Sequence, residues 1–226
     1  MPQLGESHTE YITAPKHSKT TGIKYKVTEL VTKEYLKDGF KIAELFGGVG
    51  ITTGYILDAI TPSKLFVTDI AEDCVNELIR KYGKIENVII AQSDSFHDYS
   101  ADKLEEFDFI FIDSTFKFSI ADKFEYLLEQ LKNLKCKIMF TESEMFKMLF
   151  VKQDKRDYER EKHFKKFIEY FKKYNLFVEK IYWCSSNSYL ILGREEIKDP
   201  EIIEITDIYK TWRKYLDPYK KGRLLG

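Results

Sequence analysis

Residues 44–50 read ELFGGVG and separate a short apolar run, at Phe40 and Ile42, from a stretch that is compatible with a helix. This pattern predicts a strand, a glycine turn and the start of a helix. Glycine has no Cβ, so it adopts positive φ and lets bare backbone approach a ligand closely. The acid Glu44 at the end of the strand disfavours a bound phosphate and favours a cationic or hydroxyl-bearing ligand.

Three more acids follow apolar runs farther along the chain. Asp69 closes KLFVTDI, Asp94 closes VIIAQSD and Asp113 closes FDFIFID. The carboxyl ends of parallel strands share one edge of a sheet, and ligands bind beyond that edge where the strand order reverses. Four strands that end in carboxylates therefore predict a single ligand crevice.

The chain alternates between strand and helix patterns. Helices are expected over 23–36, 52–59, 72–82, 101–105, 118–134 and 155–174, and strands over 40–46, 64–70, 88–93, 107–112, 137–141, 176–184 and 189–193. Only SSNS separates the last two strands, which is short enough for a hairpin. The prediction is an α/β fold with a doubly wound, mainly parallel, seven-stranded sheet, an antiparallel C-terminal hairpin strand and helices on both faces.

The length of 226 residues suits one α/β domain with small additions. The pattern divides the chain into a polar N-terminal arm over 1–22, the α/β domain over 23–194 and a C-terminal extension over 195–226 that is rich in basic and aromatic residues. The net charge is −1, from 36 basic and 37 acidic residues, so a globally basic nucleic-acid binder is not indicated. A local basic patch stays open.

Cysteine and histidine spacing favours neither a disulfide framework nor a metal site. Cys74, Cys136 and Cys184 are scattered and lack CxxC spacing, and the four histidines do not cluster. A reduced intracellular setting fits this usage. The sequence shows no leader pattern and no apolar run of membrane-spanning length, so a cytoplasmic protein with no membrane partner and no metal is expected.

These features resemble the class I S-adenosylmethionine-dependent methyltransferases over about residues 23–194. The resemblance rests on ELFGGVG, on the acids after the second, third and fourth strands, and on the closing hairpin. The family loop commonly carries three spaced glycines. Here Phe46 stands in the place of the first, while Gly48 and Gly50 hold the other two. Versions of this loop with an aromatic residue are common among the nucleic-acid methyltransferases of the family.

The resemblance implies S-adenosylmethionine as cofactor. Gly48 and Gly50 would approach its methionine part, and Glu44 would order its ammonium end. Asp69 would accept hydrogen bonds from both ribose hydroxyls, since a carboxylate offers two acceptor oxygens. Asp94 would contact the adenine amino group. The implied cofactor-binding residues are Glu44, Phe46, Gly48, Gly50, Asp69, Ile70, Asp94 and Ser95.

Other interpretations of the same residues stay open. Glycines between a strand and a helix often serve only as turn formers. Asp69 could cap the helix that starts at Glu72, or it could bind the ribose of a nicotinamide cofactor. Against the nicotinamide interpretation, Glu44 would face a pyrophosphate unfavourably. Asp94 taken alone could be a cap.

The segment after the fourth strand faces the methyl acceptor in the family that this chain resembles. Methyltransferases of that family that act on base amino groups often carry Asp or Asn, two prolines and an aromatic residue there. This chain keeps Asp113 and Phe116 and lacks both prolines. Asp113 would accept a hydrogen bond from the acceptor, and Phe116 would stack on a flat substrate. A helix cap or a solvated loop acid is the alternative for Asp113.

Two segments combine positive charge with features of nucleic-acid binding. Lys16–Lys26 is basic and free of acids, and Lys210–Arg223 interleaves basic residues with tyrosines and a tryptophan. The alternative for Lys210–Arg223 is an amphipathic helix whose aromatic residues dock on the sheet. The expected function is a methyltransferase acting on nucleic acid, with RNA slightly ahead of DNA. The alternatives are a small-molecule or protein acceptor, and a non-catalytic cofactor-binding relative that acts as a partner subunit.

Overall fold

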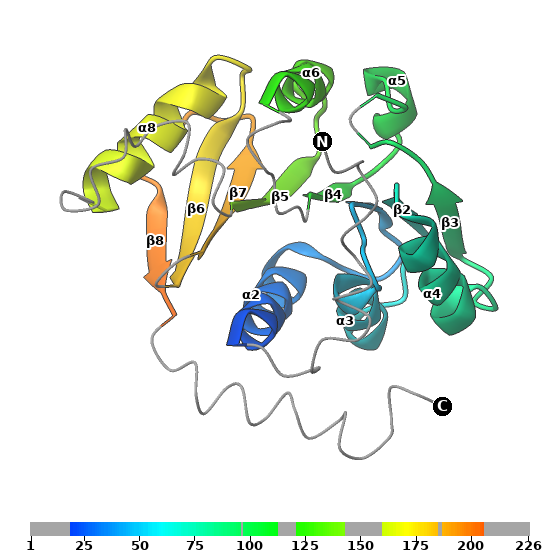
Figure 1. Ribbon diagram of the computed structural model, residues 1–226. Coiled ribbons are helices and arrows are strands. Elements are labelled where there is room, and N and C mark those ends of the chain that lie inside the picture. The colour runs from blue at the N-terminus through cyan, green and yellow to red at the C-terminus, as the bar shows by residue number, and fades with distance from the viewer. Residues whose placement is uncertain (1–18, 96, 113–120, 143–159, 185–186, 206–226) are drawn as a thin grey trace. The chain divides into compact units, whose positions relative to one another are not determined.

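The computed structural model describes residues 19–95, 97–112, 121–142, 160–184 and 187–205 (Figure 1). The chain divides into two compact units, the first containing the described residues up to Asp94 and the second spanning Ser95–Glu204. Each unit contains strands with helices between them.

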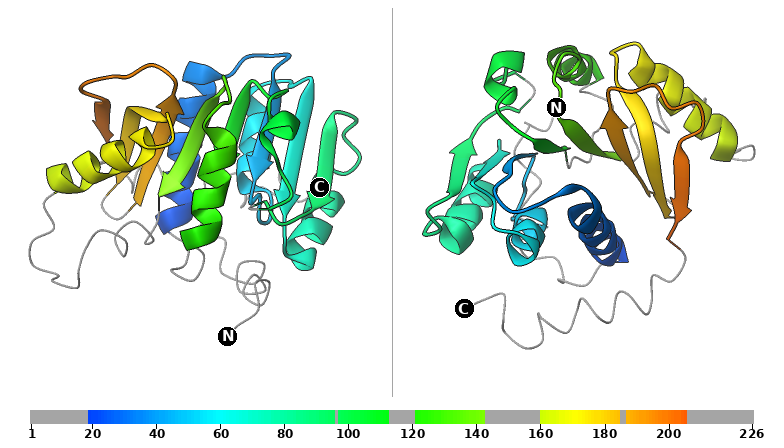
Figure 2. Two further views of the ribbon diagram at one scale, coloured as in Figure 1. Left: turned by 90° about the horizontal axis from the view of Figure 1, so that it is seen from above. Right: turned by 180° about the vertical axis from the view of Figure 1, so that it is seen from behind.

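The first unit is a three-stranded parallel sheet with the strand order β3-β2-β1. Its α3 and α4 lie on the same side of these strands (Figures 1 and 2). Successive right-handed crossovers that run in one direction along a sheet place their helices on one face. The elements are α2 Lys19–Tyr35, β1 Lys41–Leu45, α3 Ile51–Ala59, β2 Lys64–Asp69, α4 Glu72–Tyr82 and β3 Val88–Gln92.

Burial explains why these segments form strands and helices. Four of the five residues of β1 are buried, as expected for a parallel strand covered on both faces. Helix α4 has an apolar side, with Cys74, Val75 and Leu78 buried, while its first turn carries acids and its last turn carries basic residues. Charges placed in this way complement the helix dipole.

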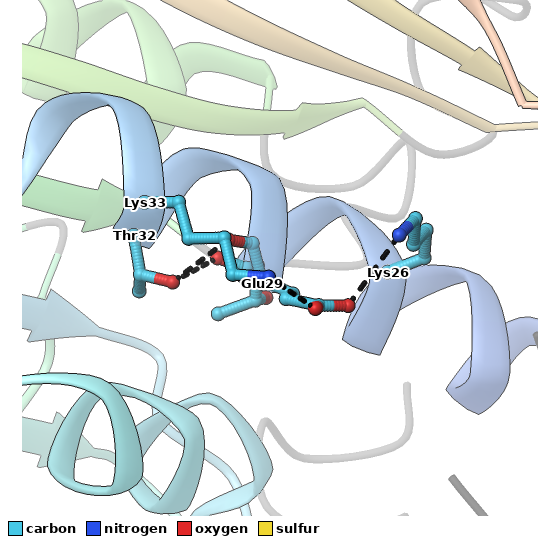
Figure 3. Close-up of polar contacts among 5 residues, drawn as sticks. Lys26, Glu29, Thr32 and Lys33 are labelled. Atoms are coloured by element: carbon cyan, nitrogen blue, oxygen red, sulfur yellow. Dashed lines mark hydrogen bonds and ion pairs between the residues drawn. The ribbon is translucent and has the colours of Figure 1, made fainter. Parts of the chain in front are cut away.

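Helix α2 begins at Lys19, four residues before the predicted start at residue 23. Lys26 and Lys33 both form ion pairs with Glu29, at 3.5 and 2.6 Å (Figure 3). The hydroxyl of Thr32 donates to the backbone carbonyl oxygens of Thr28, at 2.9 Å, and of Glu29, at 3.0 Å. Pairs of this spacing stabilise a helix by about 0.2–0.5 kcal/mol each. Burial of Val27 and Val31 therefore contributes more to the stability of α2.

The second unit has the strand order β4-β5-β7-β6-β8. Strand β4 pairs with β5 in parallel, β7 pairs antiparallel with both β5 and β6, and β6 pairs with β8 in parallel. The predicted terminal hairpin is therefore confirmed as β6–β7. The elements are α5 Ala101–Leu104, β4 Phe109–Ile112, α6 Ala121–Leu131, β5 Lys137–Glu142, α8 Arg160–Lys172, β6 Phe177–Cys184, β7 Asn187–Gly193 and β8 Glu201–Glu204.

The predicted fold class is confirmed, with β8 as an eighth strand beyond the predicted seven. Strand β8 has the sequence EIIE, is mostly exposed and lies within the segment expected to be an extension rich in basic and aromatic residues. Lys180 of β6 forms an ion pair of 2.8 Å with Glu201 of β8. The ion pair and the backbone pairing with β6 hold this strand. Its sequence lacks the apolar alternation that identifies a half-buried strand, and the strand was therefore not predicted.

Arg194 directly follows β7 and binds the ends of two helices in the second unit. Its Nη1 donates to the carbonyl oxygens of Lys132 and Asn175, both at 2.9 Å, and its Nη2 donates to the carbonyl oxygen of Leu131. Burial lowers the pKa of the guanidinium from its ordinary value. Leu131 and Lys132 lie at the end of α6, where a helix leaves carbonyl groups without intrahelical donors, and Asn175 lies three residues after the end of α8.

Replacing Arg194 by methionine keeps an apolar stem and removes the donors. We expect Arg194→Met to lower the free energy of unfolding by about 1–3 kcal/mol, because hydrogen bonds from a charged group are lost and carbonyls are left unsatisfied. Urea unfolding measures the change. The control is Lys172→Met, which breaks an exposed ion pair with Glu196 and should cost less than about 1 kcal/mol. Equal effects of the two changes would contradict the role of Arg194.

Candidate cofactor site

The glycine loop, residues 46–50, leaves β1 through three left-handed residues. Phe46, Gly48 and Gly50 have φ of 64°, 55° and 80°. Gly50 is the N-cap of α3, and its N–H donates to the carbonyl oxygen of Gly47 at 3.0 Å. Positive φ is open to glycine and disfavoured for residues with a Cβ, so Gly48 and Gly50 are required by the backbone itself.

Phe46 stands where the family that this chain resembles commonly has a glycine. The left-handed φ at this position explains why glycine is preferred there. A non-glycine residue in this conformation costs on the order of 1–3 kcal/mol. Such residues persist only where the surroundings determine the backbone, and they cluster at ligand sites. The conformation of Phe46 is therefore consistent with its prediction as a residue of the cofactor site.

Gly47 is part of this loop and was not among the predicted site residues. A Cβ on Gly47 would lie 2.5 Å from Cγ1 of Val67 in β2, which no side chain tolerates. The N–H of Gly47 also donates to the carbonyl oxygen of Thr68 at 2.7 Å. The loop therefore packs directly on β2. The pair of adjacent glycines was the signal in the sequence for such a close approach.

Asp69 links the glycine loop to the start of α4. The side chain is buried, its Oδ2 accepts the N–H of Gly48 at 2.8 Å, and its Oδ1 accepts the N–H of Ala71 at 2.9 Å. Ala71 is the N-cap of α4, so Asp69 supports the helix start without being its capping residue. Each carboxylate oxygen has two lone pairs, and Asp69 keeps the capacity to accept hydroxyl donors in addition.

Glu44 is fully buried in β1 and binds the first turn of α3. The hydroxyl of Thr53 donates to Glu44 Oε2 at 2.6 Å. Thr53 was not predicted, because a threonine within a helix carries no local signal of such a bond. The contact places an acid at the base of the glycine loop. This placement agrees with the expected preference for a cationic group over a phosphate.

The end of β3 lies beside the end of β2. Asp69 and Gln92 are partners in the parallel register, and the N–H of Ser93 donates to the carbonyl oxygen of Asp69 at 2.9 Å. Gln92 Nε2 donates to the carbonyl oxygen of Ile70 at 3.2 Å. The predicted residue Asp94 is partly buried and follows Ser93. Three predicted acids, at the ends of β1, β2 and β3, are thus found at one edge of the first unit.

Cys74 and Cys136 are not suited to act as nucleophiles. Burial, with the neighbouring carboxylates Asp69 and Asp73, raises the pKa of the Cys74 thiol to about 12. Burial raises the pKa of Cys136 to about 11. The reactive form of cysteine is the thiolate, so both thiols are protonated and inert at neutral pH.

Several predicted residues lie outside the first unit or outside the residues that the structure describes. Ser95 is buried and is the first residue of the second unit. Asp113, Phe116 and the segment Lys210–Arg223 lie outside the described residues. Of the Lys16–Lys26 segment, only Lys26 has a described side chain, and it pairs with Glu29.

Two further observations concern metals and membranes. Within the described ranges, no group of three or more histidine, cysteine, aspartate or glutamate residues is placed to hold a metal ion. No described helix is both long enough and apolar enough to cross a membrane.

No protein-family model matches this chain, and no curated protein matches it by sequence. Solved structures do match. A methyltransferase from Aquifex aeolicus described as S-adenosylmethionine-dependent has a TM-score of 0.54 and 19% identity, and the match covers 76% of this chain and 97% of that one. A second protein, from Methanococcus maripaludis, is described as a putative methyltransferase of the same kind. It has a TM-score of 0.59 and 11% identity, covering 88% and 97% of the two chains.

Magnesium protoporphyrin IX methyltransferase from Synechocystis, solved with bound S-adenosylmethionine, is a third match. Its TM-score is 0.51 and its identity is 12%, covering 78% of this chain and 79% of that one. At these identities the similarity shows the fold alone. This chain has the Rossmann-like fold of the class I S-adenosylmethionine-dependent methyltransferases.

Proposed function

We propose that this chain binds S-adenosylmethionine and transfers its methyl group to a nucleic acid, with RNA favoured over DNA. The observation that supports cofactor binding most directly is the 2.8 Å hydrogen bond from the Gly48 N–H to Asp69. It joins the glycine loop and the acid at the end of β2 in one site. The cofactor binds at these two elements in the family that the chain resembles.

The chemistry of the site fits this cofactor better than a nicotinamide dinucleotide. S-adenosylmethionine carries a ribose diol and positive charge at its sulfonium and ammonium groups. Asp69 can accept from a diol. The carboxyl carbon of Glu44 lies 3.7 Å from where a Cβ on Gly47 would be, so an acid lies directly beneath the loop. A pyrophosphate in this loop would be placed against that acid, which is electrostatically unfavourable.

When bound, S-adenosylmethionine supplies an electrophilic methyl group on a sulfonium sulfur. The residues of the chain bind and orient. The glycine loop brings backbone close to the methionine part, Glu44 orders the ammonium end and Asp69 binds the ribose. We assign Asp113 to the acceptor site, where its carboxylate accepts a hydrogen bond from the amine or hydroxyl that receives the methyl group.

The nucleic-acid acceptor is inferred from the sequence of two segments. Lys210–Arg223 combines basic residues with tyrosines and a tryptophan, which suits contact with phosphates and stacking on bases. Lys16–Lys26 adds positive charge, although its Lys26 is already paired with Glu29. A small-molecule or protein acceptor is the competing proposal. The absence of prolines after Asp113 also keeps a non-catalytic relative as an alternative.

The cofactor site is tested by Asp69→Asn, which keeps the shape of the side chain and removes its charge. We expect the affinity for S-adenosylhomocysteine, measured by calorimetry, to fall by about 1–3 kcal/mol, because a charge-assisted hydrogen bond is lost. The matched control is Asp73→Asn, since Asp73 lies in the first turn of α4 and bonds to the neighbouring Cys74, whose N–H it accepts at 2.9 Å. Binding of a nicotinamide dinucleotide, with no response to S-adenosylhomocysteine, would overturn the proposal.

The acceptor site is tested by Asp113→Ala. Loss of an orienting or proton-accepting group should lower turnover on the order of 100-fold or more, with affinity for S-adenosylhomocysteine nearly unchanged. Transfer of labelled methyl groups to RNA, DNA, protein and metabolite pools first identifies the acceptor and then measures turnover. The control is Asp108→Ala, which removes an exposed acid five residues earlier. Normal turnover of Asp113→Ala would show that Asp113 has only a structural role.

The nucleic-acid interface is tested by changing Lys220, Lys221 and Arg223 together to glutamine. Filter binding of RNA across a salt series should show weaker binding and a shallower salt dependence, by about 0.7–0.9 in log–log slope for each phosphate that the variant no longer neutralises. The control changes three exposed lysines elsewhere, at Lys84, Lys103 and Lys135. Weak, salt-insensitive binding by the unmodified chain would remove the support for a nucleic-acid acceptor.

A further inference from the structure

The C-terminal end of α4 binds the glycine loop. The hydroxyl of Tyr82 donates to the carbonyl oxygen of Gly50 at 2.8 Å, and Lys81 Nζ donates to the carbonyl oxygen of Val49 at 2.8 Å. The two donors lie 32 residues along the chain from their acceptors. Their contacts are therefore tertiary and are not a by-product of local chain geometry.

The ring of Tyr82 also occupies space that two glycines leave open. A Cβ on Gly50 would lie 2.6 Å from Cε2 of Tyr82, and a Cβ on Gly54 would lie 2.8 Å from its hydroxyl oxygen. Glycine inside a helix costs about 1 kcal/mol relative to alanine, so Gly54 in α3 needs a reason. Tyr82 explains the glycine at this position, because any larger residue at position 54 would push the Tyr82 hydroxyl away from the carbonyl oxygen of Gly50.

Residues at both ends of α4 therefore take part in hydrogen bonds that hold the glycine loop. At the N-terminal end, Asp69 accepts the N–H groups of Gly48 and Ala71. At the C-terminal end, Lys81 and Tyr82 donate to the carbonyl groups of the loop. A single rigid helix therefore connects the acid of the predicted ribose site to the far side of the loop.

Lys81 is itself held in place by the preceding turn of α4. Its Nζ lies 3.2 Å from Oε1 of Glu77. Hydrogen bonds from Arg80 and then from Lys81 lower the pKa of Glu77 to about 2. Glu77 is therefore ionised throughout the neutral range, and it keeps Lys81 directed at the loop.

We propose that Tyr82, supported by Lys81, is a positioning residue that fixes the glycine loop in its cofactor-binding conformation. The inference rests on the proposed binding of S-adenosylmethionine. The loop contains three left-handed residues, one of them Phe46, and such a backbone needs outside contacts to hold it. When only a fraction of the molecules has the loop in its binding conformation, the apparent affinity for the ligand falls by that fraction. Hydrogen bonds that hold the loop in this conformation therefore raise the affinity without contacting the ligand.

The test is Tyr82→Phe, which keeps the ring in its space and removes only the hydroxyl. Two quantities are measured: amide hydrogen exchange of residues 47–54, and calorimetric affinity for S-adenosylhomocysteine. We expect exchange in the loop to become about 3–10-fold faster and affinity to fall about 3–10-fold, as the loss of one net hydrogen bond predicts. Lys81→Met should act in the same direction.

The matched control is Tyr170→Phe in the second unit, where the hydroxyl lies 3.5 Å from a carboxylate oxygen of Glu125. This change removes a tyrosine hydroxyl from a buried ring and should leave both the exchange of the loop and the affinity unchanged. The melting temperature is recorded for both variants. A purely structural role of Tyr82 would lower the melting temperature without lowering affinity, and that result would contradict the inference.

The outcomes separate this inference from the proposed function. If the unmodified chain binds S-adenosylhomocysteine and Tyr82→Phe binds equally well, the positioning role is wrong and the cofactor proposal stands. If the unmodified chain does not bind, both are overturned. Faster loop exchange would then show that Tyr82 holds the loop for some other purpose.

Discussion

The first unit depends on one short hydrogen bond, from the backbone N–H of Gly48 to the buried carboxylate of Asp69. It forms only if β1 and β2 are parallel and in register, and if the chain turns left-handed at Phe46 and Gly48. In a buried setting such a charge-assisted bond is strong, and an unpartnered carboxylate there would be costly. Strand register, loop conformation and the start of α4 are therefore coupled through Asp69.

The sequence predicted this edge because its signals are local. An apolar run that ends in an acid can be recognised wherever it lies in the chain, so Glu44, Asp69 and Asp94 were identified by pattern, and Gly48 by the glycine turn that follows Glu44. The contacts of Gly47 with Val67, and of Gly50 with Tyr82, join residues 20 or more positions apart. No pattern of spacing specifies which side chain fills the space beside a glycine, so these contacts required the structure.

The secondary structure differs from the sequence prediction at two segments. Thr20, Thr21 and Gly22 near the start of α2 have low helix propensity, and the apolar spacing that predicts the helix lies after them. The structure continues the helix back to Lys19, so α2 is longer than its apolar spacing predicts. Strand β8 lacks an apolar face, so its sequence does not predict a strand. Backbone pairing with β6 holds it in the sheet.

Burial of the carboxylates of Glu44 and Asp69 is energetically unfavourable unless hydrogen-bond donors surround them. Here the donors come from the elements that form the site: the hydroxyl of Thr53 for Glu44, and the amides of Gly48 and Ala71 for Asp69. The acids therefore hold the loop and α3 in place before any ligand arrives. A cationic, hydroxyl-bearing ligand adds to this arrangement, whereas an anionic one opposes it. Under the proposed function, the groups that stabilise the fold would also favour a cationic ligand.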